Sequence, residues 1–288
     1  MEEHDLNRAI LLVSCPDQRG LVARLSGFID RHGGNIITAD HHVDFNSSQF
    51  LTRIEWDLER FDLARDEIAP AFRELAETIS AAWSLDFADI TQRVAIWVTR
   101  QDHCLLDLIW RQQAGDLRAE IPLIVSNHPE LESTAYQFNI DYRYFPITAA
   151  NRAEQEAAQL QVLRDYQIDL VVLAKYMQIL GADLVGNLDR RAINIHHSFL
   201  PDFPGAAPYQ RAFERGVKII GATAHYVTLE LDEGPIIEQD IVRVTHRDNL
   251  SDLVRKGKDL EKIVLARAVR DHLEHRVLVY GAKTVVFS

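Results

Sequence analysis

The spacing of apolar residues across positions 8–87 predicts a small unit that mixes strands with helices. Residues 8–14 are largely apolar, as in a buried strand, and residues 21–32 repeat apolar side chains at helical spacing until Gly33 and Gly34 end the pattern. The remaining segments give the order βαββαβ. The predicted strands cover 8–14, 35–45, 48–58 and 83–87, and the predicted helices cover 21–32 and 63–80.

This order, together with the opening CPDQRGLVARLSGFIDRHGGNI, resembles an ACT domain, a small regulatory module found on enzymes of amino-acid and one-carbon metabolism. In that family the loop after the first strand and the following helix frequently bind a small amino acid at a domain interface. The resemblance implies effector-binding roles for Asp17, Arg19, Gly20 and Asn35. The alternative is a module that only makes oligomer contacts. Because ACT modules commonly pair edge to edge, a homo-oligomer is expected.

Beyond a short polar connection at 88–92 the pattern changes to strands and helices in alternation. We therefore expect two domains, an ACT domain at 1–88 and a second domain at 89–288. Alternation of this kind predicts an α/β fold whose mainly parallel sheet is covered by helices on both faces. Ligands of such sheets collect at the carboxyl ends of the strands, here after Ala174 and Ile195.

Composition narrows the class of partner. The chain of 288 residues is 47% apolar and carries a net charge of −12, which argues against nucleic-acid and anionic-membrane partners because both favour clustered Lys and Arg. Two cysteines, Cys15 and Cys104, and the lack of a secretory signal or a long apolar span indicate a reducing, cytoplasmic compartment.

Three polar side chains between Asn194 and Gly234 could converge on one reacting carbonyl. Asn194 and His196 are two positions apart on a predicted strand and so share a face, and Asp232 follows in a loop closed by Gly234. An amide N–H can stabilise a developing oxyanion, an imidazole can move protons near neutral pH, and a carboxylate can orient the imidazole or position a water. The set suits attack on a carbonyl carbon without a metal.

The run from Asn194 to His196, the segment SFLPDFPG and the later HYVTLELDEGPII resemble the catalytic core of the formyltransferase family that uses 10-formyltetrahydrofolate. The resemblance spans about residue 93 to the end and implies a Rossmann-like catalytic domain with Asn194, His196 and Asp232 as catalytic residues. The segment VVLAKYMQIL matches the family's folate pocket, although relatives often carry Arg at the position of Gln178. The implied substrate-binding residues are Met177, Gln178, Ile179, Leu180, Gly205, His225, Leu231 and Gly234.

The sequence lacks two features that formyltransferases use to bind their formyl acceptors, a glycine-rich phosphate loop and a basic surface. Members that formylate glycinamide ribonucleotide carry a glycine-rich phosphate loop, whereas WVTRQDHCLLDLIW contains no glycine. Members that act on initiator tRNA need basic surface, and this chain is acidic. An ACT module on this core is the arrangement of the formyltetrahydrofolate deformylases, which implies hydrolysis of 10-formyltetrahydrofolate to formate and tetrahydrofolate without a cofactor, with formate feeding purine synthesis. The alternatives are a transferase to an unidentified small amine and a folate or amino-acid sensor.

Several further residues invite chemical roles. His41 and His42 are strand neighbours on opposite faces, so a metal pair is not expected. By the same alternation His197 should face away from His196. Cys104 is expected in the core or behind the site, and Lys175 is either an exposed lysine or a contact to an anionic part of the folate.

Overall fold

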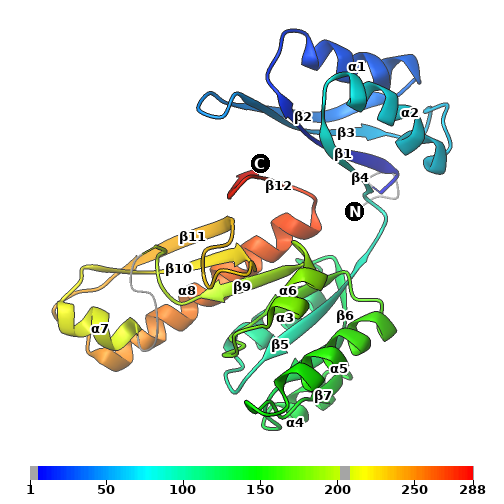
Figure 1. Ribbon diagram of the computed structural model, residues 1–288. Helices are drawn as coiled ribbons and strands as arrows, with labels where there is room; N and C mark the ends of the chain where they lie inside the picture. The colour runs from blue at the N-terminus through cyan, green and yellow to red at the C-terminus, as the bar shows by residue number, and fades with distance from the viewer. Residues whose placement is uncertain (1–5, 202–207, 288) are drawn as a thin grey trace. The chain divides into compact units, whose positions relative to one another are not determined.

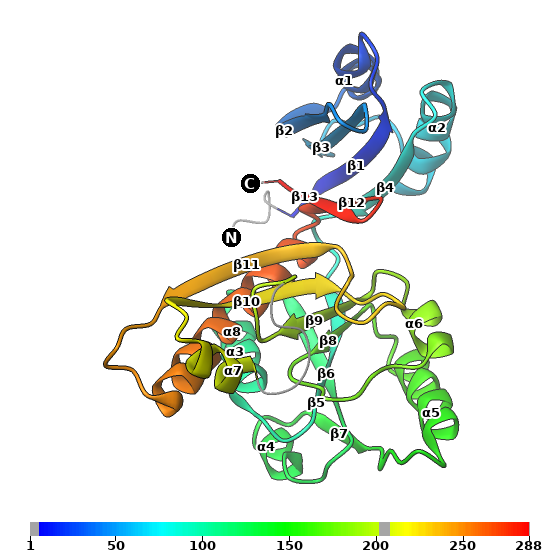
Figure 2. The same cartoon turned by 60° about the vertical axis from the view of Figure 1, so that its left-hand side comes forward.

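The structure is a computed structural model that describes residues 6–201 and 208–287. It divides the chain into two compact units, Met1–Thr91 together with Glu274–Ser288, and Gln92–Leu273. Figures 1 and 2 show both units from two sides. Among the described residues, no helix has the length and apolar character needed to cross a membrane.

The N-terminal unit has the βαββαβ order that the sequence predicts. Its antiparallel sheet has the order β2-β3-β1-β4, and both helices pack on one face (Figure 1). The elements are β1 (Arg8–Pro16), α1 (Leu21–Arg31), β2 (Asn35–Asp44), β3 (Gln49–Asp57), α2 (Arg65–Thr78) and β4 (Ala82–Phe87).

The opposite face of this sheet is covered by the end of the chain. Leu11 and Val13 of β1 pack with the helices, whereas Leu12 points the other way and packs with Leu51 against a hairpin formed by β12 (Val277–Tyr280) and β13 (Lys283–Val286). The second domain expected from the sequence, 89–288, would include this hairpin. In the structure it belongs to the N-terminal unit because it buries the apolar residues on the second face of the sheet.

The second unit is a seven-stranded sheet of order β11-β10-β9-β8-β5-β6-β7, as the alternating pattern predicts. The pairs from β9 to β7 are parallel, and β10 is antiparallel to both β9 and β11. The elements are β5 (Gln92–Val98), α3 (His103–Ala114), β6 (Ala119–Ser126), α4 (Glu132–Gln137), β7 (Asp141–Tyr144), α5 (Arg152–Asp165), β8 (Leu170–Leu173), α6 (Ala182–Leu188), β9 (Ala192–His196), α7 (Pro208–Arg215), β10 (Ile219–Tyr226), β11 (Ile236–Arg243) and α8 (Leu250–Leu273).

Helices cover both faces of this sheet. Ala95 and Trp97 of β5 pack against Leu163 of α5 and Leu184 of α6, while α8 runs across β9, β10 and β11 and contacts α3 (Figure 2). The loops after β8 and β9 both start at the carboxyl ends of their strands, on the same side of the sheet, because the two strands are parallel neighbours. A ligand of an open α/β sheet is expected at these carboxyl ends.

Candidate active site

Strands β9 and β10 bring three of the predicted side chains together. In their antiparallel register His225 lies opposite Asn194, and Thr223 lies opposite His196. Directly opposed residues of two strands have neighbouring side chains on the same face. Asn194 and His225 are therefore partners fixed by the sheet, and His196 follows on the same face of β9.

Asp232 reaches this face from the loop between β10 and β11. Its backbone is left-handed, with φ of 59°, which is uncommon for a residue other than glycine. The loop then passes so close to β10 that a Cβ atom on Gly234 would collide with the carbonyl oxygen of Tyr226. Glycine at 234 thus permits the close approach that returns Asp232 to the strand ends.

A direct contact joins His196 to Asp232. Nδ1 of His196 lies 3.2 Å from Oδ2 of Asp232, and this contact holds the pKa of the Asp232 carboxyl well below its usual range. An ionised carboxylate only accepts hydrogen bonds, so Nδ1 of His196 carries the proton. Nε2 of His196 then holds a lone pair. It is buried and has no hydrogen-bond partner within the described part of the chain.

The second imidazole fixes the asparagine. Nδ1 of His225 lies 2.9 Å from the carbonyl oxygen of Tyr226 and must donate to it. Nε2 of the neutral ring is therefore an acceptor, and the amide nitrogen of Asn194, 3.2 Å away, donates to it. The second amide N–H of Asn194 stays available for another acceptor. His225, which the family resemblance implies as a substrate-binding residue, thus belongs to this cluster and is almost fully buried.

His197 does not lie where strand alternation predicts. Its ring stacks on the ring of His196, with centroids 5.0 Å apart and planes 24° apart. Strand β9 ends at His196, so the alternation of faces stops one residue earlier than expected. Burial lowers the pKa of His197 to about 4, and the charge of the nearby Lys175 acts in the same direction. A neutral second imidazole thus lies against the first.

Most of the predicted folate-binding residues lie on the loop after β8 and the loop after β10. Met177, Ile179 and Leu231 are each more than half exposed. Leu180 packs partly into the core next to α6, and Gln178 is half-buried. Gly205 lies outside the described residues.

The predicted effector residues of the N-terminal unit do not form one group within a single chain. Asp17 lies beside the β2–β3 turn, where its N–H donates to the carbonyl oxygen of Ser48, and Gly20 precedes α1 with φ of 83°. Arg19 is exposed in the same loop. Asn35 lies at the other end of the sheet, opposite Asp57.

Three other expectations concern Cys104, Lys175 and His41. Cys104 is fully buried, as expected for a core position. Lys175 is also buried, at 6% exposure, and is neither a surface lysine nor free to reach a ligand: its ammonium lies 3.3 Å from the carboxylate of Glu261. His41 hydrogen-bonds Thr52 across the strands. Glu261 is a polar residue that the sequence analysis missed, although it lies among the apolar positions of α8.

A mainly parallel sheet with Asn194, His196 and Asp232 gathered at β9 and the loop after β10, preceded in the chain by a βαββαβ module, is the arrangement of a formyl transferase domain joined to an ACT domain. The models of these two families match residues 92–269 and 9–77 respectively. The formyltetrahydrofolate deformylases of Synechocystis sp. and Bacillus subtilis are 62% and 50% identical to this chain, over 97% and 96% of it and 98% and 93% of their own lengths. The crystal structure of a formyltetrahydrofolate deformylase from Pseudomonas syringae pv. tomato matches with a TM-score of 0.95 and 44% identity, covering 98% of this chain and 94% of that one. The chain belongs to the formyltetrahydrofolate deformylase family.

Proposed function

We propose that this chain hydrolyses 10-formyltetrahydrofolate to formate and tetrahydrofolate. The main support for this proposal is the environment of the two ring nitrogens of His196. Asp232 holds its Nδ1, while its buried Nε2 has no partner within the described residues. An imidazole oriented in this way has one nitrogen free to take a proton from a nucleophile near neutral pH.

The reaction begins when Nε2 of His196 takes a proton from a water molecule as its oxygen bonds to the formyl carbon. The carbonyl oxygen gains negative charge and is stabilised by the free amide N–H of Asn194. Collapse of this intermediate breaks the bond from carbon to N10, and His196 returns the proton to that nitrogen. Formic acid leaves and loses its remaining acidic proton to solvent, so formate and tetrahydrofolate are the products.

We assign the base role to His196 and an orienting role to Asp232. A carboxylate whose pKa lies well below its usual range is a weak proton acceptor. Its negative charge instead stabilises the imidazolium that forms when His196 is protonated. Both proton transfers at the reacting atoms, from water and to N10, use His196, so we propose that the reaction proceeds without a cofactor.

The exposed apolar side chains Met177, Ile179 and Leu231 are proposed to bind the pterin and so to bring the formyl group to His196. The names of the relatives favour water as the acceptor over an amine. The decisive experiment is formate release in ¹⁸O-labelled water with no amine present. Labelled formate, lost in His196→Ala and retained in the exposed control His246→Ala, is the expected result. Release only after an amine is added would replace hydrolysis by transfer.

We further propose that the N-terminal unit binds a small amino acid in a homo-oligomer and thereby changes turnover. Asp17 and Arg19 lie at one end of its sheet and Asn35 at the other, so a site that uses both ends needs two chains. Turnover should respond to amino acids in the full chain and lose that response in Arg19→Ala. The exposed Arg24 of α1 provides the control, Arg24→Ala. An equal response in both variants would contradict this role of Arg19.

A further inference from the structure

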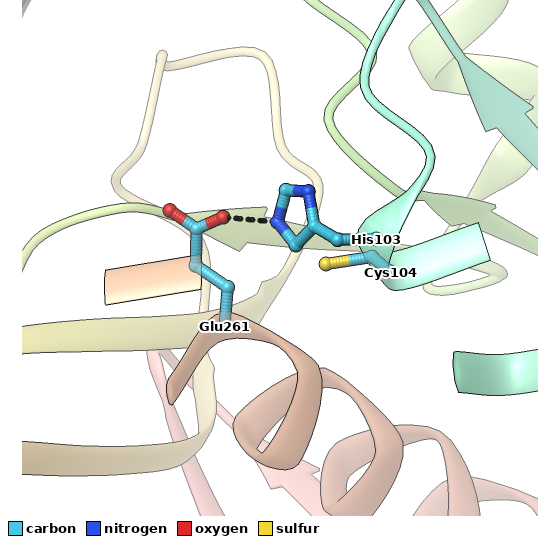
Figure 3. Close-up of side chains that lie close together, drawn as sticks. All are labelled: His103, Cys104 and Glu261. Atoms are coloured by element: carbon cyan, nitrogen blue, oxygen red, sulfur yellow. Dashed lines mark hydrogen bonds and ion pairs between the residues drawn. The ribbon is translucent and has the colours of Figure 1, made fainter. Parts of the chain in front are cut away.

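A buried polar cluster centred on Glu261 has no part in the hydrolysis described above. Glu261 is 1% exposed and comes from the middle of α8. Its Oε1 accepts a hydrogen bond from Tyr209 at 2.7 Å and lies 3.3 Å from the ammonium of Lys175. Its Oε2 lies 2.7 Å from Nε2 of His103, as Figure 3 shows. Four groups are thus held together away from solvent, and a buried carboxylate with this many donors is firmly fixed.

The same cluster has some of the donor types of a metal site. His103, Cys104 and Glu261 offer atoms that all lie within 4.8 Å of one another (Figure 3). However, the ammonium of Lys175 already supplies a positive charge to the carboxylate. Burial, followed by the charge of Glu261, also raises the pKa of the Cys104 thiol far above its usual range, so the thiol stays protonated and is a poor ligand. A hydrogen-bonded anchor accounts for these contacts better than a metal site.

A glycine in α8 shows what the anchor holds. Gly257 lies one helical turn before Glu261, and a Cβ atom at this position would collide with the ring and hydroxyl of Tyr209. Glycine weakens the interior of a helix, so its presence here fits a need for close approach. Tyr209 lies in the notch above Gly257, and its hydroxyl reaches the carboxylate on the next turn.

Tyr209 in turn faces the stacked imidazoles. Its ring centroid lies 6.1 Å from that of His197, which stacks on His196 at 5.0 Å. A continuous series of contacts therefore runs from Glu261 through Tyr209 and His197 to His196. The charged or titratable groups that act on His197 come from several elements: Lys175 after β8, His196 on β9, Asp232 before β11 and Glu261 on α8.

We propose that Glu261 and Tyr209 are positioning residues for His196, with Gly257 providing the notch in which the Tyr209 ring is held. His197 transmits this restraint as the ring that backs His196. The proposal rests on the catalytic role of His196 given above. Its physical basis is that a general base must be held at a fixed distance and angle from the proton it removes.

The test is a double-mutant cycle between Gly257 and Tyr209, with kcat and KM for formate release as the readout. Gly257→Ala should displace the Tyr209 ring and lower kcat by about 10- to 100-fold. KM should change little, because the side chains proposed to bind the pterin are unchanged. Tyr209→Phe, which keeps the ring and loses only the bond to Glu261, should lower kcat by about tenfold. The matched control is Gly186→Ala in α6, where a Cβ atom has open space, and it should leave kcat unchanged.

The cycle separates positioning from a general loss of stability. In the Tyr209→Ala background, Gly257→Ala should cause no further fall in kcat, because the ring that it displaces is gone. Additive losses, or Gly257→Ala with wild-type kcat, would overturn the proposal. The imidazole NMR signals of His196 provide a readout that needs no turnover: they should shift in Gly257→Ala and not in Gly186→Ala. If the wild-type chain releases no formate, the proposed function fails, whereas these signals still decide the positioning role.

Discussion

Two carboxylates of the second unit, Asp232 and Glu261, both contact histidine but are used differently. The side chain of Asp232 is 18% exposed, lies on a loop and contacts His196 and His225. The side chain of Glu261 is 1% exposed, lies on a long helix and is bonded through both oxygens. The first carboxylate contacts an imidazole whose buried second nitrogen has no partner among the described residues, whereas both oxygens of the second carboxylate have partners. A catalytic site needs a polar atom that is available to the substrate, as Nε2 of His196 is proposed to be. A structural cluster such as that of Glu261 instead pairs its polar atoms within the protein.

The comparison predicts that the Asp232 cluster determines rate more than stability. His196→Ala should lower kcat for formate release by about 10³-fold, in the range expected for loss of a general base. Its effect on the free energy of unfolding should be smaller than that of Glu261→Ala, because the Asp232 carboxylate, whose side chain is 18% exposed, can be hydrated when it loses the His196 ring. Steady-state kinetics and urea unfolding on the same preparation measure both. A His196→Ala chain that is grossly unstable but turns over normally once folded would reverse the assignment.

Substitutions in the Glu261 cluster should affect the free energy of unfolding more than those in the Asp232 cluster do. Glu261→Ala leaves the ammonium of Lys175 and the hydroxyl of Tyr209 buried without their acceptor. Removing one partner of a buried ion pair costs about 3–5 kcal/mol, which urea unfolding would show directly. The isosteric Glu261→Gln keeps the shape and should cost less. Equal stability of the wild-type chain and Glu261→Ala would mean that the carboxylate is not an anchor.

The free energy of unfolding should depend on pH through His197, whose ring lies between those of His196 and Tyr209. Its pKa is about 4 in the folded chain and about 6.5 in an unfolded one. The unfolded chain therefore binds more protons between these values. The contribution of His197 to stability is complete above about pH 6.5 and is lost as the pH falls toward 4.

Lowering the pH from 7 to 4.5 should thus cost about 2 kcal/mol of unfolding free energy through this one residue. His197→Phe keeps an aromatic ring and should remove that part of the acid sensitivity. Asp232 acts in a separate window, because its lowered pKa makes its contribution fade only below about pH 4. An unchanged pH dependence in His197→Phe would place the titrating group elsewhere.

The sequence predicted the strands and helices of the first unit, and the alternation of strands and helices in the second, because the apolar periods are regular and many element ends carry glycine or polar residues. Asn194 and His196 could be placed on one face from spacing alone, since the strand continues through both. His197 could not, because where β9 ends depends on the chain that follows. Helix α6 was not predicted as a separate element, since its seven residues are too few to show a helical period.

The Glu261 cluster shows a different limit of sequence reasoning. Lys175 and Glu261 are 86 residues apart, so no local pattern reveals that a lysine after a strand is buried against a helix. An acidic residue among the apolar positions Leu260, Val264 and Leu265 was the available signal, since Glu is rarely buried unless paired. The packing of the terminal hairpin on the first unit was hidden in the same way, because Leu278 and Leu12 meet only in the fold.

The smallest effects on kcat and on the free energy of unfolding are expected for exposed apolar side chains on the loops after β8 and β10. Ile179 is 62% exposed, so Ile179→Ser should change the free energy of unfolding by less than about 0.5 kcal/mol. If its apolar surface packs against the pterin, KM should rise by about tenfold, the equivalent of 1.4 kcal/mol, while kcat stays near the wild-type value because ground state and transition state lose the same contact. Leu229 is similarly exposed at 64% and lies two residues before the predicted Leu231, so Leu229→Ser provides a comparison of equal polarity change. A rise in KM at Ile179 but not at Leu229 would place the edge of the folate site between the two loops, and no rise at either would remove the loop after β8 from substrate binding.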